Sequence, residues 1–435
     1  MERKYKISIN IPIFMISMLI LLVIFCKYNI ESRMGYIIFP VEFIFAFVLY
    51  SRQTEDGRLN GVSVRRVIYV YFFFMIYRIF VSALITGSLY DGTKKILYYE
   101  VGVLFLLYFA VCLTNAEDII ITLRNIGIVN AVLGVYETIT RSSIFMRFID
   151  VENRIQFSNL LGTENNRART IFFHPIICAV FCTYIWCILL YYPMKGKWIN
   201  TISQIALIIC LMGTKSRSSW ISFAIVNVIY LVQRLSKKKG TIEIGNIFYG
   251  LVFAIFMIVI FIIQRDYILS AGRVLLNRWM LVLDADDAGN YNRITMIRNG
   301  LQDFAGWGVL SKIFGKGYLY AYNLLQRHSI RGWTTAVDNS YLTALLDYGI
   351  GGLLFLFYFI YISIKSIHSR SRLHKMCGLS ILSLFISGFF YEMFSWFTPN
   401  FLLALSFCLI SVHFEENDSF DCNTEVNGTI MTDIM

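Results

Sequence analysis

The sequence predicts an all-α fold, a polytopic membrane helical bundle with about 12 transmembrane helices. The chain of 435 residues is 57% hydrophobic and only 15% charged, whereas an average soluble protein is about 25% charged. Apolar runs that are about long enough to cross a bilayer recur from one end to the other. Because no polar stretch between them is large enough to fold alone, we expect a single transmembrane domain over residues 1–414.

The expected spans are residues 7–26, 36–50, 67–86, 96–114, 119–139, 171–192, 204–212, 220–232, 247–264, 340–364, 377–390 and 401–413. No small-residue cleavage site follows the first run, so we expect it to remain as the first helix. The tail at 415–435 is polar and acidic without periodicity, and we expect it to be disordered in the cytoplasm.

Clusters of Lys and Arg predict that both termini are cytoplasmic. The basic groups at 3–6, 52–66, 195–197, 234–239 and 365–375 all fall on one side of the expected spans, as the positive-inside rule requires. The net charge of +11 could suggest nucleic acid. Most of this charge lies in loops between spans, so we expect no nucleic-acid partner.

Two long loops, at about 140–170 and 265–339, are expected on the outer side. Loops of this length are usually functional or disordered, and the second is too rich in Trp, Leu and Ile for disorder. Four of its apolar residues recur at helical spacing, namely Ile294, Ile297, Leu301 and Phe304. This pattern predicts an amphipathic helix on the membrane surface, with its apolar side toward lipid or the bundle. Both loops are basic, which suits either an anionic substrate or anionic lipid headgroups.

Arginines near the outer edge of the expected spans are candidates for phosphate binding. The turn T-K-S-R-S-S-W at 214–220 places Arg217 at the membrane edge, where a charge is costly unless it is used. Arg293 begins the amphipathic helix, and Arg167 and Arg169 precede a span that opens with I-F-F-H-P. Because guanidinium groups bond phosphate oxygens in pairs, two or three of them could stabilise a pyrophosphate leaving group without a metal.

A possible base stands just before the span at 340–364. Asp338, followed by Asn339, would be ionised near neutral pH and could accept a proton from an attacking hydroxyl. Each candidate also has a structural alternative. Asp338 could be a helix N-cap, Arg217 could extend to the lipid headgroups, and Arg293 could be a surface charge on an interfacial helix.

The sequence contains no nucleotide-binding or metal-binding motif. The five histidines are scattered, and His174 beside Pro175 fits the start of a helix better than a ligand set. Most cysteines lie in apolar runs, which favours a role as small buried hydrophobic residues. We therefore expect neither a cofactor nor a metal site.

Five charged residues lie inside apolar runs: Glu42, Arg78, Glu100, Arg124 and Glu392. Ionisable residues within a membrane can mark a path for protons or ions. For Arg78 with Glu100, a structural ion pair is an equal alternative.

Four motifs follow one another in the second half of the chain: S-R-S-S-W, N-R-I-T-M-I-R-N-G-L, K-I-F-G-K-G-Y and D-N-S-Y-L-T-A-L-L-D-Y-G-I-G-G-L-L. Together they resemble the O-antigen ligase and Wzy polymerase superfamily. The resemblance covers about 167–364 in matching order. It implies a metal-independent, inverting glycosyltransferase with a GT-C-like fold in the bacterial cytoplasmic membrane. Such an enzyme transfers glycan from undecaprenyl pyrophosphate to a sugar hydroxyl at the outer face.

The resemblance also implies roles for individual residues. Arg217 and Arg293 would hold the pyrophosphate, and Asp338 would take the place of the base. The candidate substrate-binding residues are Arg167, Arg169, His174, Ser216, Ser218, Asn339 and Tyr341. Ligases of this superfamily resemble H-N-S where this chain reads D-N-S, which favours a polymerase of capsule or O-antigen repeats.

Two alternatives remain open at this point. One is ligation of the glycan to another acceptor, and the other is transport or flipping of lipid-linked glycans. The expected partners of a polymerase are undecaprenyl-pyrophosphate-linked oligosaccharides and membrane lipid, with a chain-length regulator as a further candidate.

Overall fold

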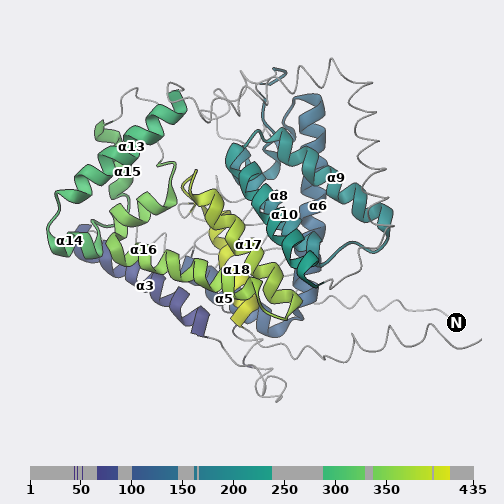
Figure 1. The fold of residues 1–435 in the computed structure, drawn as a ribbon, viewed down its shortest axis with the longest axis horizontal. Coiled ribbons are helices and arrows are strands. Elements are labelled where there is room, and N and C mark those ends of the chain that lie inside the picture. The colour runs from purple at the N-terminus through teal and green to yellow at the C-terminus, as the bar shows by residue number, and fades with distance from the viewer. Residues whose placement is uncertain are drawn as a thin grey trace, which may run out of the picture.

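The computed structural model is all-helical over the residues that it describes (Figure 1). These residues are 44, 47, 51, 66–86, 100–145, 161–163, 166–237, 288–328, 337–393 and 396–411. The spans expected at 7–26 and 247–264 and the tail at 415–435 lie outside this part, as does almost all of the span at 36–50. The predicted all-α class is confirmed for the described part.

The described helices, in chain order, are α3 (Arg66–Thr86), α5 (Gly102–Leu113), α6 (Ala116–Thr140), η3 (Thr170–Phe172), α8 (Pro175–Tyr191), α9 (Lys197–Gly213), α10 (Arg217–Lys237), α13 (Ala288–Ala305), α14 (Val309–Phe314), α15 (Tyr320–His328), α16 (Ser340–Ile367), α17 (Arg372–Gly388) and α18 (Phe397–Ser411). Within this part of the chain, three helices are long and apolar enough to cross a membrane: Arg66–Ile85, Ala116–Thr140 and Ser340–Ile367. Four more are apolar but shorter.

Helices α8 and α17 form the centre of the bundle. Every residue from 177 to 189 of α8 is buried, as expected for a helix that is apolar on all sides and surrounded by other helices. Helix α17 packs against α8, α10, α16 and α18. Figure 1 shows it between α16 and the group formed by α6, α8, α9 and α10.

Several helix boundaries differ from the expected spans. The span at 171–192 is broken, because Phe173 takes a left-handed conformation (φ 56°) and α8 begins only at Pro175. The predicted span at 204–212 was too short, because α9 begins at Lys197 and its first two turns mix polar residues with apolar ones, with Lys197, Trp198 and Ile199 exposed. Apolar patterning alone misses helix ends of such mixed composition. Helix α10 likewise begins at Arg217 rather than at 220.

Two charges inside apolar runs have structural partners. Arg78 forms a buried ion pair with Glu100, and its guanidinium lies over the rings of Phe74 and Tyr348. Arg124 donates to the carbonyl oxygens of Tyr192 (2.8 Å) and Pro193 (2.9 Å), just beyond the end of α8. The structural alternative is thus confirmed for Arg78 with Glu100.

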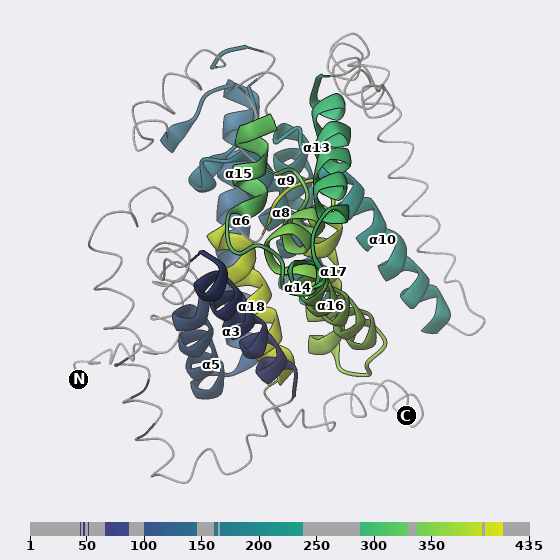
Figure 2. The ribbon, with the colours of Figure 1, turned by 90° about the vertical axis from the view of Figure 1, so that its left-hand side faces the viewer.

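The loop at 265–339 contains helices that dock on α16. Figure 2 shows α13, α14 and α15 close to α16, and all three contact it. The expected amphipathic helix corresponds to α13, in which Ile297 and Leu301 are exposed. Phe304, from the same predicted set, packs with Met296 in a second apolar cluster, and Gly300 faces α16. Residues 296, 300 and 304 recur every four positions, so they share one face of the helix.

A break in α16 creates the docking surface for this loop. Gly349 has φ 66° and ψ −162°, values outside the helical region. The carbonyl oxygens of Leu346 and Asp347 accept hydrogen bonds from the backbone N–H groups of Lys316 (3.0 Å) and Gly317 (2.8 Å). The Asp347 carboxylate also accepts from the N–H groups of Leu319 (3.1 Å) and Ala321 (2.8 Å). The motifs K-I-F-G-K-G-Y and D-Y-G-I-G-G are therefore in direct contact.

Replacing Gly349 by alanine is expected to release the loop from α16. The new Cβ would overlap the carbonyl oxygen of Ile313, and φ 66° is strained for any residue with a Cβ. We expect faster tryptic cleavage between α13 and α15. Gly308→Ala is the matched control, because its Cβ would point into open space. Equal protease resistance of the two variants would contradict this docking.

Candidate functional site

The turn between α9 and α10 is held by its own hydroxyl groups. Ser216 Oγ lies 3.2 Å from both Ser218 Oγ and Ser219 Oγ, and all three serines are buried. Thr214 Oγ1 donates to the carbonyl oxygen of Leu211 (2.6 Å) and accepts from the N–H group of Ser216 (3.3 Å). The hydroxyls of Ser216 and Ser218 therefore shape the turn that presents Arg217.

Arg217 is the first residue of α10 and is half-buried. The N–H groups of the first helical turn have no partners within the helix, and the helix dipole adds partial positive charge there. A guanidinium at this position therefore adds a full positive charge to a helix end that already favours anions.

The segment before α8 is bound to this turn. Arg167 Nε donates to the carbonyl oxygen of Thr214 (2.7 Å). The backbone N–H group of Ala168 donates to the carbonyl oxygen of Gly213 (2.9 Å). The Arg169 side chain is almost completely buried (2% exposed). Both predicted arginines thus lie beside the turn that carries Arg217, and at least Arg167 helps to hold the backbone.

Glu137, near the end of α6, anchors the same segment. This residue is fully buried, and its Oε2 accepts from the N–H groups of Arg169 and Thr170 (both 2.9 Å). Its Oε1 accepts from Ser143 Oγ (3.1 Å) and the N–H group of Ile144 (3.2 Å). The sequence analysis missed Glu137, although a carboxylate one turn from the end of an apolar helix is itself a signal.

These hydrogen bonds also support a strained backbone. Thr170 has φ 50°, a left-handed conformation that is costly for a β-branched residue. Such strain persists only where the surroundings enforce it, and the Glu137 carboxylate binds the N–H group of Thr170 itself.

Glu137→Ala is expected to lower the stability of the fold. The substitution leaves at least two buried N–H groups without their acceptor, which costs about 1–3 kcal/mol for each group. We expect a lower midpoint of thermal unfolding in detergent. Glu117→Ala is the control, because Glu117 is exposed on the same helix. An unchanged midpoint for Glu137→Ala would show that this anchor is not needed.

His174 links α8 to the segment between α17 and α18. It occupies the N-cap position of α8 next to Pro175, as the sequence predicted. Its ring stacks on Tyr391 (5.3 Å between centroids) and lies 4.6 Å from the ring of Trp396. Its Nε2 is 3.5 Å from the Tyr391 hydroxyl. Tyr391 and Trp396 were not among the predicted site residues.

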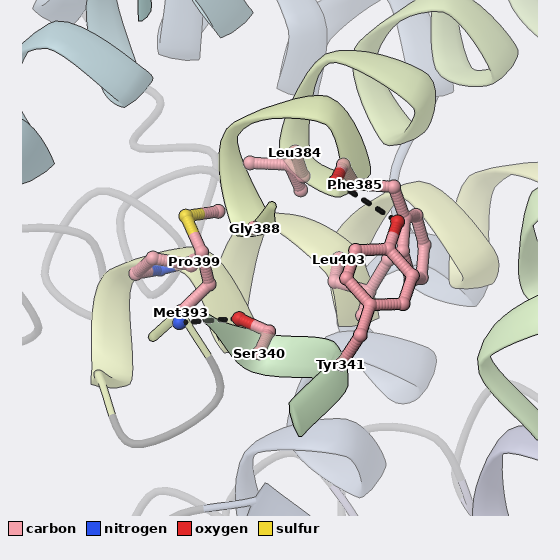
Figure 3. A pocket seen from close by; sticks show the side chains of 8 residues that line it. All are labelled: Ser340, Tyr341, Leu384, Phe385, Gly388, Met393, Pro399 and Leu403. Atoms are coloured by element: carbon pink, nitrogen blue, oxygen red, sulfur yellow. Dashed lines mark hydrogen bonds between the residues drawn. The ribbon is translucent and has the colours of Figure 1, made fainter. Parts of the chain in front are cut away.

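Tyr391 in turn connects this segment to the start of α16. The Ser340 hydroxyl donates to the carbonyl oxygen of Tyr391 (3.0 Å) and accepts from the N–H group of Met393 (2.8 Å), a contact drawn in Figure 3. The motif D-N-S therefore lies at the same end of the bundle as His174.

The N-cap of α16 is Asn339, which corrects the alternative that assigned this role to Asp338. Asn339 Oδ1 accepts from the N–H groups of Tyr341 and Leu342, both at 2.9 Å. Because the cap position takes a single residue and Asn caps as well as Asp, Asp338 lies one position outside the helix. Asp338 is half-buried.

A small apolar pocket lies beside this motif (Figure 3). Its lining residues are Ser340, Tyr341, Leu384, Phe385, Gly388, Met393, Pro399 and Leu403. The Tyr341 hydroxyl donates to the carbonyl oxygen of Phe385 (3.0 Å) across it. Its volume of about 10 Å³ suits one water molecule at most, so this pocket does not hold a sugar.

The segments that carry most of the predicted site residues thus meet at one end of the bundle, which we call the site end. There α6 and α9 end and α8, α10 and α16 begin. Hydrogen bonds and ring contacts connect the segments of Arg167, Arg169, His174, Ser216 and Asn339, as given above. Arg293 lies in α13, which packs on α16, but its side chain is outside the described residues.

This fold and the site end define a helical membrane protein with arginine and serine residues at one end of its helical bundle. Residues 202–357 match the family model described as O-Antigen ligase. The matched stretch runs from α9 into α16 and includes Arg217, Arg293 and Asp338. The resemblance to the O-antigen ligase and Wzy superfamily is thereby confirmed over this stretch. None of the curated proteins compared with the chain matches it.

Proposed function

We propose that this protein is a polysaccharide polymerase. It would transfer a growing glycan from undecaprenyl pyrophosphate to the non-reducing-end hydroxyl of a lipid-linked repeat unit. The observation that carries the proposal is the O-Antigen ligase match over residues 202–357, because it covers the turn with Arg217 and the motif with Asp338. Transfer would take place at the outer face of the bacterial cytoplasmic membrane, where the sequence places the loops of the site end.

The proposed reaction is a single displacement with inversion at the anomeric carbon. The acceptor hydroxyl oxygen bonds to this carbon, the bond to the pyrophosphate oxygen breaks, and the bonding electrons leave with the pyrophosphate. Asp338 accepts the hydroxyl proton as general base. Arg217 and Arg293 stabilise the charge that develops on the leaving group. No metal takes part in this step.

The contacts at the site end support different roles for the other candidates. Arg167, Ser216 and Ser218 bond within the turn and its neighbouring segment, so they would position Arg217. Asn339 caps α16 and would set the position of Asp338. His174 and Tyr341 lie near the same end, where their rings pack against Tyr391 and Phe389, so they would shape the wall of the proposed site.

A ligase is the second candidate, because the matching family model is itself described as O-Antigen ligase. The residue Asp338 favours the polymerase, since ligases of the superfamily resemble H-N-S at this point. A transporter of lipid-linked glycans would require polar residues through the depth of the membrane. The buried charges of Arg78, Glu100 and Arg124 instead have partners within the protein.

Purified protein with lipid-linked repeat units tests the proposal. A polymerase should produce a ladder of glycan lengths and release undecaprenyl pyrophosphate without added metal or ATP. In a second arm, the same donor is offered together with a different, non-repeat acceptor. One transfer to that acceptor without a ladder would identify a ligase. Movement of intact substrate between leaflets, with no bond formed, would overturn the enzymatic proposal.

A further inference from the structure

Three cysteine thiols meet between α8 and α9. Cys210 Sγ lies 3.5 Å from Cys182 Sγ and 3.9 Å from Cys178 Sγ. All three sulfur atoms lie within 4.8 Å of one another. Cys178 and Cys182 are one helical turn apart on α8, so both side chains point toward α9. All three cysteines are almost completely buried, with at most 1% of their surface exposed.

The surroundings of this cysteine cluster are tightly packed and partly polar. A Cβ on Gly134 of α6 would overlap Cys210 Sγ, so three helices meet there. Thr170 Oγ1 lies 3.3 Å from Cys178 Sγ, and Asn130 Nδ2 lies 4.0 Å from it. The Thr170 hydroxyl donates its proton to the carbonyl oxygen of Arg169 (2.8 Å), so it can only accept from the Cys178 thiol. The Asn130 amide, in contrast, can donate to this sulfur, and such a donor favours a thiolate.

The spacing of the sulfur atoms fits a single bound ion. With metal–sulfur bonds of about 2.3 Å, three sulfurs in a planar triangle around an ion lie about 4 Å apart. The Sγ–Sγ distances of 3.5 and 3.9 Å from Cys210 need only small side-chain adjustments to reach this separation of about 4 Å. Soft thiolate ligands select ions such as Cu(I) and Zn²⁺.

The number of ligands favours Cu(I). Structural zinc sites are almost always four-coordinate. Among the residues that the structure describes, this group offers three sulfur atoms and no imidazole or carboxylate. A monovalent d¹⁰ ion such as Cu(I) accepts three soft ligands without a fourth. The start of α8 lies within one turn of Cys178 and offsets part of the thiolate charge.

We propose that Cys178, Cys182 and Cys210 bind one Cu(I) ion that joins α8 to α9 near the site end. Thiols that become thiolate ligands release their protons to solvent, and no electron is transferred. Because the cluster is buried, the ion would be taken up as the helices assemble. Thr170, which touches the cluster, is also bound by Glu137, so the ion would support the segment that carries Arg169. This structural role is independent of the proposed glycan transfer.

Metal analysis of the full-length chain tests the proposal. The protein is purified in detergent under reducing conditions from cells grown with added copper, and copper and zinc are measured after removal of loosely bound metal. We expect close to one copper per chain and an ultraviolet thiolate-to-Cu(I) charge-transfer band. X-ray absorption should show three sulfur neighbours.

Cys210→Ser should reduce the bound copper by about tenfold or more, because it removes a direct ligand. Cys187→Ser is the matched control, since Cys187 is equally buried on α8 but lies outside the group. If Cys210→Ser does not yield monodisperse protein, Cys178→Ser provides the same comparison. Copper at the wild-type level in a cluster variant would overturn the site. The site would also be overturned if the wild-type protein retained no metal, if it contained stoichiometric zinc, or if it formed a Cys182–Cys210 disulfide.

Discussion

Arg217→Lys is expected to reduce glycan transfer by about 100-fold or more, the usual cost of removing one group that stabilises transition-state charge. Lysine keeps the positive charge but loses the planar fork that binds two phosphate oxygens at once. Arg217 begins α10 within a turn whose hydroxyls bond one another, so the backbone of the variant should stay in place. Release of undecaprenyl pyrophosphate and polymer length, measured with purified protein, check this result.

Arg234→Lys is the control for this experiment. Arg234 lies on the same helix, exposed and several turns away from Arg217, so its replacement should leave transfer unchanged. If Arg217→Lys makes polymer of wild-type length at the wild-type rate, Arg217 extends to lipid headgroups and does not bind the leaving group.

Asp338→Asn should lower the rate by about 100- to 10,000-fold, the range that general bases contribute. The amide has nearly the shape of the carboxylate but cannot accept the proton from the acceptor hydroxyl. Because Asn339 is the N-cap of α16, this substitution leaves the cap intact. A rate measurement with saturating donor should therefore show reduced turnover. Thermal unfolding of the same variant should show an unchanged midpoint.

Asp118→Asn serves as the comparison, because Asp118 also lies at the start of a helix, in the first turn of α6, at the opposite end from Glu137. It should have little effect on turnover. Full activity of Asp338→Asn would exclude the role of general base and would shift attention to other groups at the site end.

The fold class followed from the sequence because the hydrophobic effect acts on whole segments. Apolar runs predicted α3, α6, α16 and α18 with only small errors at their ends. The sequence analysis did not predict the beginning of α9, which mixes polar and apolar residues, or the break at Phe173. Both depend on individual hydrogen bonds and backbone conformations, to which hydropathy is not sensitive.

For the site, the sequence identified residues by chemical type but not their partners. Arginine and serine at a membrane edge pointed to Arg217 and its turn, and the motif order pointed to Asp338. The sequence offered Asp338 as the N-cap of α16, but the helix begins one residue later than that role requires, so Asn339 is the N-cap. Glu137 was missed because its bonds reach Arg169 and Thr170, more than thirty residues away in the chain.

By itself, the sequence determined that this is a helical membrane protein with basic loops and with motifs that resemble the O-antigen ligase and Wzy superfamily, because composition and motif spacing can be read within single segments. Only the tertiary structure decided that the segments of Arg167, His174, Ser216 and Asn339 meet at one end of the bundle. It alone also brought three cysteines from two helices together. Such contacts arise from the packing of distant helices, and residue patterns along one segment do not encode which neighbour that segment will meet.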